Sequence, residues 1–259
     1  MRSSLTSGCR TVASYCALAP LYDRIMHHVR YDEWVSLIQT VVANYAATPD
    51  PLVLELGGGT GTLGLKLQRA GMRYVGSDAC PAMCSIARGK AVPWVGADCR
   101  SLPFRRMFDL VIFLYDGINY LCTLSEYDRL FETVHRQLSP GGLFLFDVTT
   151  TANSLRNFSE YVERADFDDS YFVRHSYYDA AAQLQYNDFT IFVKQGQPGD
   201  GYQRVDEQHV QRVFPIAVLR DQIPPDRFDV LGVWDDFTFK KCTRKSERVH
   251  FLLRKKAAD

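Results

Sequence analysis

Between residues 52 and 148 the chain alternates short, largely apolar runs with segments whose apolar residues recur at helical spacing. Apolar runs without polar alternation are typical of strands that are buried on both faces of a sheet. The pattern predicts strands at 52–56, 73–77, 92–97, 108–114 and 143–148, with helices at 63–70, 81–88 and 125–138 between them. Strands joined by helices in this order run parallel with right-handed crossovers, which predicts a three-layer α/β/α sandwich.

Turn and capping residues set the expected ends of the helices. A first helix is predicted over residues 21–45, where apolar side chains recur at helical spacing until Pro49 and Pro51. Ser125 is the expected N-cap of the last helix in the alternating region, and the sequence PGG at 140–142 ends that helix. Ligands of such sheets bind beyond the carboxyl ends of the strands, so we expect the site at that edge.

The pattern changes after residue 149. From 161 to 214, aromatic and β-branched runs with period-two alternation predict antiparallel strands in an inserted β-rich lobe. A short helix and two strands then return to the core. The predicted fold is a Rossmann-like sandwich with a mostly parallel seven-stranded sheet and an inserted antiparallel lobe. The expected segments are a flexible tail at 1–20, a core at 21–149, the lobe at 150–214 and a return to the core sheet at 215–259, with its helix at 215–221 and its strands at 228–234 and 248–253.

Composition limits the classes of partner. The 30 basic and 30 acidic residues cancel, which argues against nucleic acid as a partner because no overall positive field attracts a phosphate backbone. No apolar run reaches the roughly 18 residues that a membrane span needs. Seven cysteines without a Cys-x-x-Cys pair suggest neither a disulfide framework nor a zinc site, so the cytoplasm is the expected location and no metal is expected. Either a monomer or a homodimer fits the sequence.

The two ends of the chain carry basic residues. Residues 1–15 hold Arg2 and Arg10 and no acid, a pattern shared by a transit peptide, a short tail and an over-extended start, of which we favour the tail. At the other end we expect basic side chains to form the solvated face of a last strand. These residues are Lys240, Lys241, Arg244, Lys245, Arg248, Arg254, Lys255 and Lys256.

The first strand runs into a glycine-rich turn, residues 55–61 (ELGGGTG). Glycines let the backbone pass close to a ligand, and the N-terminus of the following helix attracts an anion. The spacing of Gly59, Gly61 and Gly64 also matches a dinucleotide fingerprint, which is a weak signal by itself. Glu55 favours S-adenosylmethionine over a dinucleotide, because its carboxylate repels a pyrophosphate but pairs with an ammonium or sulfonium group. A Glu55 that only bonds backbone groups in the turn is the alternative.

Residues 52–61 resemble motif I of the class I S-adenosylmethionine-dependent methyltransferases, and further landmarks follow in the order of that family. Asp78, after the second strand, matches the acid that bonds the two ribose hydroxyls. Asp98 matches the aspartate that takes the adenine amino group, and the Cys99 backbone lies beside the same edge. The sequence LSPGG at 138–142 is similar to the turn before the fifth strand of the family.

The resemblance implies S-adenosyl-L-methionine as cofactor. Met83 matches a residue that packs against adenine, although a core methionine is the alternative, and Gly58 stands where the commoner motif has cysteine or another small residue. Aromatic side chains of the first helix are expected to reach over the same site. The expected cofactor-binding set is Glu55, Gly57, Gly58, Gly59, Gly61, Asp78, Ala79, Met83, Asp98, Cys99, Tyr115, Tyr22, Tyr31 and Trp34.

A narrower resemblance covers most of the chain. Residues 21–26 (LYDRIM), 115–121 (YDGINYL), 207–212 (EQHVQR) and 246–250 (SERVH) are similar to segments of small bacterial methyltransferases with an inserted β-lobe. Characterised proteins of this type include amino-sugar and small-amine N-methyltransferases. Gly117 stands where they often carry serine, so a contact from that side chain is absent.

Acceptor chemistry is expected where the lobe meets the carboxyl ends of the strands. His209 is the candidate base, and a histidine satisfied within a β-ladder is the alternative. Asp116 is a candidate to hold an acceptor amine, with a cap or turn residue as the alternative, and Tyr22 is a third catalytic candidate. The expected substrate contacts are Asn119, Tyr120 and Arg212.

The sequence therefore predicts an S-adenosylmethionine-dependent methyltransferase that acts on nitrogen or oxygen of a small molecule. One rival is a nicotinamide-dependent oxidoreductase, against which Glu55 and the PGG turn argue. A second rival is a catalytically silent scaffold that binds the cofactor, and the sequence leaves this alternative open.

Overall fold

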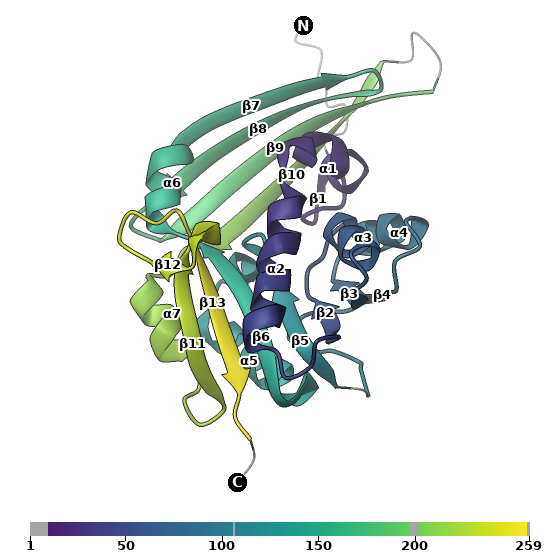
Figure 1. Cartoon of the computed structure of the whole chain (residues 1–259). Helices are drawn as coiled ribbons and strands as arrows, with labels where there is room; N and C mark the ends of the chain where they lie inside the picture. Colours follow the sequence, from purple (N-terminus) through teal and green to yellow (C-terminus); the bar gives the residue numbers. More distant parts are fainter. Residues whose placement is uncertain (1–9, 106, 197–200, 258–259) are drawn as a thin grey trace, which may run out of the picture.

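The computed structural model describes residues 10–105, 107–196 and 201–257 as two sheets, with helices packed around the larger one (Figure 1). The strands of the larger sheet, which we call the core sheet, are β2 Leu52–Glu55, β3 Arg73–Asp78, β4 Trp94–Gly96, β5 Phe108–Phe113, β6 Leu138–Thr149, β11 Phe228–Asp235, β12 Lys240–Lys241 and β13 Arg248–Lys255. The other sheet, the lobe sheet, contains β1 Arg10–Val12, β7 Glu160–Phe167, β8 Ser170–Asp179, β9 Leu184–Lys194 and β10 Tyr202–Arg212. The α-helices are α1 Ala19–Ile25, α2 Tyr31–Tyr45, α3 Thr62–Arg69, α4 Pro81–Gly89, α5 Leu124–Gln137, α6 Thr151–Asn157 and α7 Ile216–Gln222. The short 3-10 helices are η1 Met26–His28, η2 Gly117–Tyr120 and η3 Asp236–Thr238.

The core sheet has the order β12-β11-β13-β6-β5-β2-β3-β4. Strands β6, β5, β2, β3 and β4 pair in parallel, whereas β13 and β11 join in antiparallel pairs. The mostly parallel seven-stranded sheet is thus confirmed, and the described part of the chain adds the two-residue β12 at one edge. From β2 the chain moves outward to β3 and β4 and then returns to β5 on the other side. The strand order therefore reverses between β2 and β5, where α/β sheets hold their ligands.

Two apolar layers cover the core sheet because successive side chains of a strand point to opposite faces. Leu54 of β2 packs with the buried residues of α5 and α7, while the adjacent Val53 packs with those of α2 and α3. Both side chains are fully buried. This arrangement explains why the first three positions of β2 are all apolar, and it gives the three-layer sandwich that the alternating sequence predicts.

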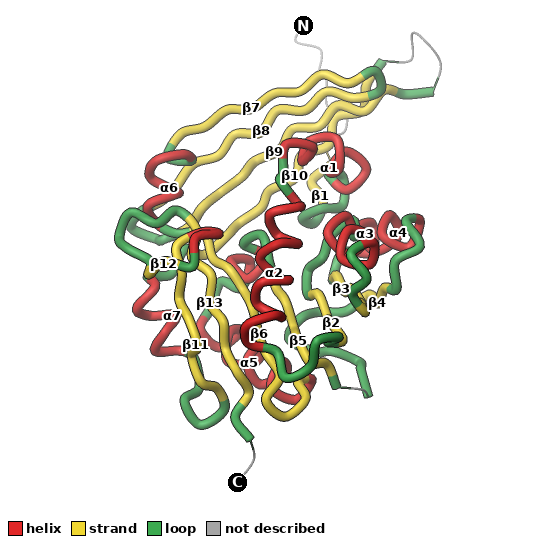
Figure 2. The backbone as a smooth tube through the Cα atoms, viewed as in Figure 1, coloured by secondary structure: helices red, strands yellow, loops and turns green. Residues whose placement is uncertain are grey.

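The lobe sheet has the order β1-β10-β9-β8-β7, and its four long strands are antiparallel (yellow in Figure 2). This confirms the predicted antiparallel lobe. Its inner face packs against α1 through an apolar cluster in which Phe172 and Ile191 from the lobe meet Leu21 and Ile25. A helix near the N-terminus therefore lies between the lobe and the core.

The single helix predicted over residues 21–45 is wrong. The structure ends α1 at Ile25, passes through η1 and an extended Val29 (φ −69°, ψ 123°), and begins α2 at Tyr31. The apolar residues on the two sides of this break serve different cores. Leu21 and Ile25 pack against the lobe, whereas the apolar face of α2 packs on the core sheet. One straight helix does not present both faces in these two directions, so the chain breaks between them.

Two other expectations about local structure differ from what we find. Thr123, not Ser125, is the N-cap of α5, because Thr123 has extended backbone and forms a capping box with Glu126. The first nine residues of the predicted tail lie outside the described residues, but from Arg10 onward the chain has defined structure. Strand β1 pairs in parallel with β10. None of the described helices is both long and apolar enough to span a membrane.

Candidate active site

A cavity of about 450 Å³ opens at the carboxyl ends of the parallel strands, and we call it the edge cavity. Its walls come from the glycine turn after β2, the end of β3, the residues that follow β4 and β5, and residues 13–16. A narrower cavity of about 50 Å³ adjoins it and is lined by Tyr31, Trp34 and Glu55. The site therefore lies where the strand order reverses, as the rule for α/β sheets requires.

The glycine turn forms one wall of the edge cavity. Gly57, Gly59 and Gly61 all have positive φ (58°, 59° and 76°), a conformation that side chains disfavour. A Cβ atom at Gly57 lies 2.7 Å from the ring of Phe113, so no larger residue fits there without movement. The backbone of Gly58 donates to the Ser77 carbonyl at 2.9 Å, which ties the turn to the end of β3.

Asp78 holds the turn from the neighbouring strand. One carboxylate oxygen accepts from the Gly59 N–H at 2.9 Å and the other accepts from the Cys80 N–H at 2.7 Å. Burial raises the pKa of this carboxyl, and the backbone donors partly oppose that shift. An ionised carboxylate has about four acceptor sites, so two remain for a ligand with neighbouring hydroxyl groups.

Glu55 lies at the base of the narrower cavity and is 4% exposed. Burial raises its pKa to about 7, and the hydrogen bond that the Tyr74 hydroxyl donates to it only partly opposes this. No cation pairs with this carboxylate within the described chain. A cationic ligand group in the narrower cavity therefore stabilises a buried charge that the protein leaves without a counter-ion.

Asp98 and Arg100 form the far wall of the edge cavity. The guanidinium of Arg100 donates to both carboxylate oxygens of Asp98, at 2.9 and 2.5 Å, and it also pairs with Glu126. These contacts lower the pKa of Asp98. Next to them, burial raises the pKa of the Cys99 thiol to about 12, so this cysteine stays protonated at neutral pH.

Helix α1 closes over the glycine turn through Asp23. Its carboxylate accepts from Lys90 at 2.5 Å and from the hydroxyls of Thr60 and Thr62 at 2.5 and 3.0 Å. The adjacent Arg24 reaches the opposite way and bonds Asp169 of the lobe. Tyr22, which precedes Asp23 and Arg24 in α1, lines both the edge cavity and the narrower one.

A third cavity, of about 150 Å³, lies beneath the inner face of the lobe sheet, and we call it the lobe cavity. Side chains from α1, α6 and strands β8 to β10 line it. Tyr15, Tyr22, Tyr115 and Tyr120 line both this cavity and the edge cavity. The two spaces therefore meet at a wall of four tyrosines.

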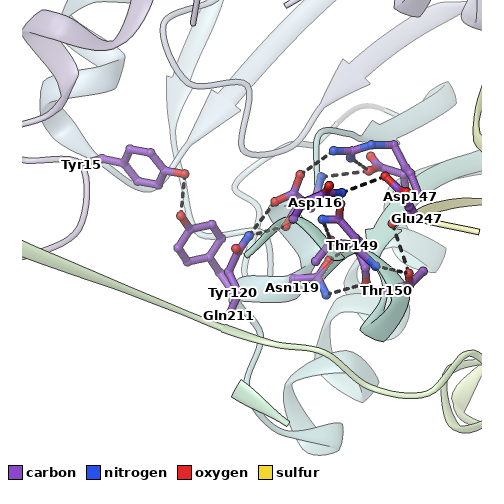
Figure 3. Close-up of polar contacts among 12 residues, drawn as sticks. Tyr15, Asp116, Asn119, Tyr120, Asp147, Thr149, Thr150, Gln211 and Glu247 are labelled. Atoms are coloured by element: carbon purple, nitrogen blue, oxygen red, sulfur yellow. Dashed lines mark hydrogen bonds and ion pairs between the residues drawn. The ribbon is translucent and has the colours of Figure 1, made fainter. Parts of the chain in front are cut away.

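One end of the lobe cavity holds a largely buried ionic network in which Arg248 pairs with Asp116 and Asp147, the two aspartates labelled in Figure 3. Arg248 pairs with Asp116 at 3.0 Å and with Asp147, and Gln211 donates to the other Asp116 oxygen at 2.7 Å. Burial raises the pKa of both aspartates, and Arg248 opposes that shift. Arg248 is thus a correction to the expected solvated strand face, because its charge is enclosed between two carboxylates.

His209 faces the lobe cavity from β10 and is 2% exposed. Its Nε2 lies 2.6 Å from Glu207 and its Nδ1 lies 2.8 Å from the Tyr120 hydroxyl. The Tyr120 hydroxyl lies 2.7 Å from that of Tyr15 (Figure 3). Glu207 also accepts backbone N–H bonds from Tyr15, Ala17 and Leu18, which holds the N-terminal segment against the lobe.

The structure brings together most of the predicted site residues. The predicted residues that line the edge cavity or the narrower cavity are Gly57, Gly58, Gly59, Asp78, Ala79, Met83, Asp98, Cys99, Tyr22, Tyr31, Trp34, Glu55 and Tyr115. Gly61, the fourth predicted glycine of the turn, lines neither. His209, Asp116, Tyr22 and Tyr120 line the lobe cavity. Their roles as cofactor-binding and catalytic residues remain predictions.

Two predicted substrate contacts are not at the cavity. The Asn119 amide donates to the Arg212 carbonyl at 2.8 Å and accepts from the Thr149 N–H at 3.0 Å, so its polar atoms join η2 to β10 and β6 (Figure 3). Arg212 bonds the Ala182 carbonyl and lies over the Phe214 ring. Both side chains are committed to the fold and line none of the cavities described above.

Sequence reasoning missed four residues that shape the site: Tyr15, Arg100, Glu207 and Arg248. Tyr15 lies in the segment that we predicted as a tail, and its position depends on the distant Glu207. For Glu207 a usable signal was present in the segment EQHVQR. Glu207 lies two residues before His209, and residues two apart on a strand share a face. Across the described residues, no group of three or more His, Cys, Asp or Glu side chains could hold a metal ion.

Known proteins resemble this chain over nearly its whole length. A family model described as a methyltransferase domain matches residues 53–142. The Bacillus subtilis protein named "Putative methyltransferase YqeM" is 29% identical over 248 residues, which cover 93% of this chain and 97% of the relative. A solved S-adenosylmethionine-dependent methyltransferase from Clostridium acetobutylicum has a TM-score of 0.76 at 23% identity and covers 94% of this chain and 99% of its own. The sugar N-methyltransferase KedS8 from a Streptoalloteichus species has a TM-score of 0.74 at 18% identity, covering 98% and 100%. These two structures show a shared fold.

Proposed function

Because this chain belongs to the class I S-adenosylmethionine-dependent methyltransferases, we propose that it transfers the methyl group to nitrogen or oxygen of a small molecule in the lobe cavity. The observation that carries this proposal is the tyrosine wall where the edge and lobe cavities meet. A cofactor on one side and an acceptor on the other then face each other across a buried boundary. The lobe cavity, of about 150 Å³, limits the enclosed part of the acceptor to a small molecule or a small group.

The residues of the edge cavity fit S-adenosylmethionine. Asp78 has acceptor sites left for the two ribose hydroxyls, and Gly57 and Gly59 line the cavity without side chains that would fill it. Glu55, buried without a cation, suits the amino end of the methionine part. We assign the adenine end to the pocket between Met83 and Asp98, which closes the opposite side of the same cavity.

The work of the protein in this reaction is alignment. When bound, the cofactor supplies an electrophilic methyl group on a sulfonium, so the reaction needs a nucleophile held in line with the carbon–sulfur bond. Orientation of this kind lowers a barrier by roughly 7–11 kcal/mol. Tyr22 is suited to that task because its side chain lines all three cavities and is anchored by Asp23 on the core side and Arg24 on the lobe side.

We assign the other two catalytic candidates to the acceptor. Asp116 presents to the lobe cavity a carboxylate side chain that is only 20% exposed, and its pairing with Arg248 fixes its orientation. It is suited to hold a hydrogen-bond donor of the acceptor. His209 is the candidate base, and its hydrogen bonds with Glu207 and Tyr120 fix the plane of its ring.

The test is transfer of labelled methyl groups. The protein is incubated with S-adenosylmethionine labelled in the methyl group and with the low-molecular-mass metabolite fraction of its source cells, and products are separated by chromatography. We expect label in a small organic product. A scaffold that only binds cofactor transfers no label although S-adenosylhomocysteine raises its unfolding temperature. Label that appears only when RNA or protein is added refutes a small-molecule acceptor.

We propose the cytoplasm as the location and a monomer or homodimer as the working form, with no nucleic-acid or membrane partner. Six cysteines of the described chain are free thiols, which suits a reducing compartment. The balanced charge gives no overall positive field that would attract a nucleic acid.

A further inference from the structure

Four side chains form a continuous hydrogen-bonded row from the lobe sheet to the tyrosine wall. Glu207 bonds His209, His209 bonds Tyr120 and Tyr120 bonds Tyr15, at 2.6, 2.8 and 2.7 Å. The row starts at a carboxylate with no exposed side-chain surface and ends at a hydroxyl whose residue lines both the edge and the lobe cavities. It therefore connects the place where the two cavities meet with a buried acid.

The acid fixes the direction of every bond in the row. An ionised carboxylate only accepts hydrogen bonds, so His209 donates from Nε2 to Glu207. Its Nδ1 then carries a lone pair and accepts from the Tyr120 hydroxyl. The Tyr120 oxygen in turn accepts from the Tyr15 hydroxyl. The Tyr15 N–H lies 3.3 Å from Nε2 but only 2.6 Å from Glu207, so it bonds the carboxylate.

Both ring nitrogens of His209 are thus engaged, and the free acceptor position of the row lies on the Tyr15 oxygen. Burial raises the pKa of Tyr15 and of Tyr120 above the usual value, so both hydroxyls keep their protons at neutral pH and act as carriers. The groups that face His209 are Glu207 on its own strand, Tyr15 from the N-terminal segment, Tyr120 from η2 and the uncharged Phe189 from β9. Arg174 on β8 and Asp116 lie within electrostatic range of Tyr120.

We propose that Tyr15 is a catalytic residue that takes the proton of the acceptor into this row, with Tyr120, His209 and Glu207 as positioning residues behind it. The inference rests on the proposed function. As the bond from the acceptor atom to the methyl carbon forms, the carbon–sulfur bond breaks and its electron pair stays on sulfur. The acceptor proton passes to the Tyr15 oxygen, the Tyr15 proton to Tyr120, and the Tyr120 proton to Nδ1 of His209. The imidazolium formed there is balanced by Glu207.

This arrangement also defines the chemical class of the acceptor. A row of proton carriers is useful only if the methylated atom carries a proton at working pH. The acceptor is therefore a hydroxyl compound or a primary or secondary amine, and an amine that is protonated first gives its proton to the row and then attacks with the lone pair that this frees. A tertiary amine or a thioether has no proton to give after it loses its lone pair to the methyl group, so neither uses the row.

The first test is kinetic, with methyl-labelled S-adenosylmethionine and the low-molecular-mass metabolite fraction as the probe. We expect Tyr15→Phe to lower the saturated rate about 100-fold, while the amount of metabolite fraction that gives half the maximal rate changes less than about threefold. Tyr127→Phe is the control, because Tyr127 is a fully buried tyrosine whose hydroxyl bonds the Ile118 carbonyl away from the cavities. The control is expected to keep the wild-type rate.

The pH profile separates proton transfer from a structural role. The wild-type and His209→Gln proteins are expected to differ in their pH profiles, because glutamine cannot take up the proton that the row delivers. If Tyr15→Phe proves too unstable to assay, Tyr120→Phe interrupts the row while Tyr15 stays in place. An unchanged saturated rate and profile in the tyrosine variant that is assayed refutes the proton path.

The second test needs no acceptor. Nitrogen-15 NMR of histidine-labelled protein with S-adenosylhomocysteine is expected to show His209 neutral, with its proton on Nε2, and to show a shifted Nδ1 signal in Tyr120→Phe. A proton on Nδ1 reverses every bond in the row and overturns the proposal. Absence of labelled product from the wild-type protein refutes the proposed function and the proton path with it. Labelled product formed at equal rates by the wild-type and Tyr15→Phe proteins refutes the proton path alone.

Discussion

Replacement of Glu55 by glutamine should remove the pH dependence of cofactor binding near neutrality. Burial holds the pKa of Glu55 at about 7 when no cation is near it, so at pH 7 about half of the molecules carry a proton there. A ligand ammonium next to the carboxylate favours its charged form and lowers this pKa. Binding therefore releases about half a proton at pH 7, and protons compete with the ligand below that pH.

The expected magnitude follows from the same pKa. The dissociation constant of S-adenosylhomocysteine is expected to be about tenfold higher at pH 6 than at pH 8, because the protonated fraction falls from about ten elevenths to one eleventh. The stability of the folded protein without ligand changes with pH in the opposite direction to the affinity. Because the pKa of Glu55 in the folded protein lies above the ordinary glutamate value of 4.5, stability is lost as pH rises from about 4.5 to 7, by roughly 3 kcal/mol when the whole window is crossed.

Isothermal titration calorimetry at pH 6, 7 and 8 measures both the affinity and the number of protons released. Glu55→Gln keeps an acceptor for the Tyr74 hydroxyl but cannot ionise. The titration of the ligand and of Asp78 affects both proteins, so it cancels in the ratio of their dissociation constants at each pH. Tyr74→Phe removes a bond that favours the charged form, and the pH dependence should then move to higher pH. Equal pH dependence in the wild-type and Glu55→Gln proteins refutes the assignment of Glu55 to the ammonium end.

Three further substitutions test other parts of the structure. Gly57→Ala should lower the free energy of unfolding by about 1–3 kcal/mol in urea titrations, because of its positive φ and the 2.7 Å approach to Phe113; an unchanged midpoint contradicts the steric argument. Asp23→Asn should weaken S-adenosylhomocysteine binding about fivefold in calorimetry, because this half-exposed group anchors α1 to α3 and α4, whereas Arg24→Gln, on the lobe side, serves as a control with unchanged affinity. Arg248→Met should destabilise the protein by about 3–5 kcal/mol, and by more at pH 8 than at pH 5, because the two aspartates that it leaves unpaired are neutralised at lower pH; equal losses at both pH values contradict this account.

The core could be predicted from the sequence because its signals are local. The apolar run at 52–56, the glycine turn and the acid at 78 each specify a strand, a turn and a carboxylate within a few residues. The prediction of a single helix over 21–45 was wrong for a related reason. The periodicity shows that its residues are buried, but it does not show that Ile25 and Trp34 are buried against different partners.

The acceptor side depends on contacts between distant residues, which a single sequence does not reveal. Arg248 has the same local context as the exposed basic residues around it, and only its pairing with Asp116, 132 positions away, distinguishes it. Tyr15 lies in a segment without any structural signal, and its position is set by the buried carboxylate of Glu207, 192 positions away. Asn119, predicted as a substrate contact, bonds backbone groups in the structure, since a polar residue after a strand end can equally serve the backbone.

The attachment of the N-terminal segment to the lobe has a consequence for engineering. Strand β1 pairs with β10, Glu207 accepts the N–H groups of residues 15, 17 and 18, and α1 fills the apolar inner face of the lobe sheet. Although they are far apart in the chain, residues 10–25 and the lobe are therefore a single transplantable unit. A chimera that grafts the lobe of a relative onto this core should inherit a new acceptor preference only when the matching N-terminal stretch is exchanged along with it.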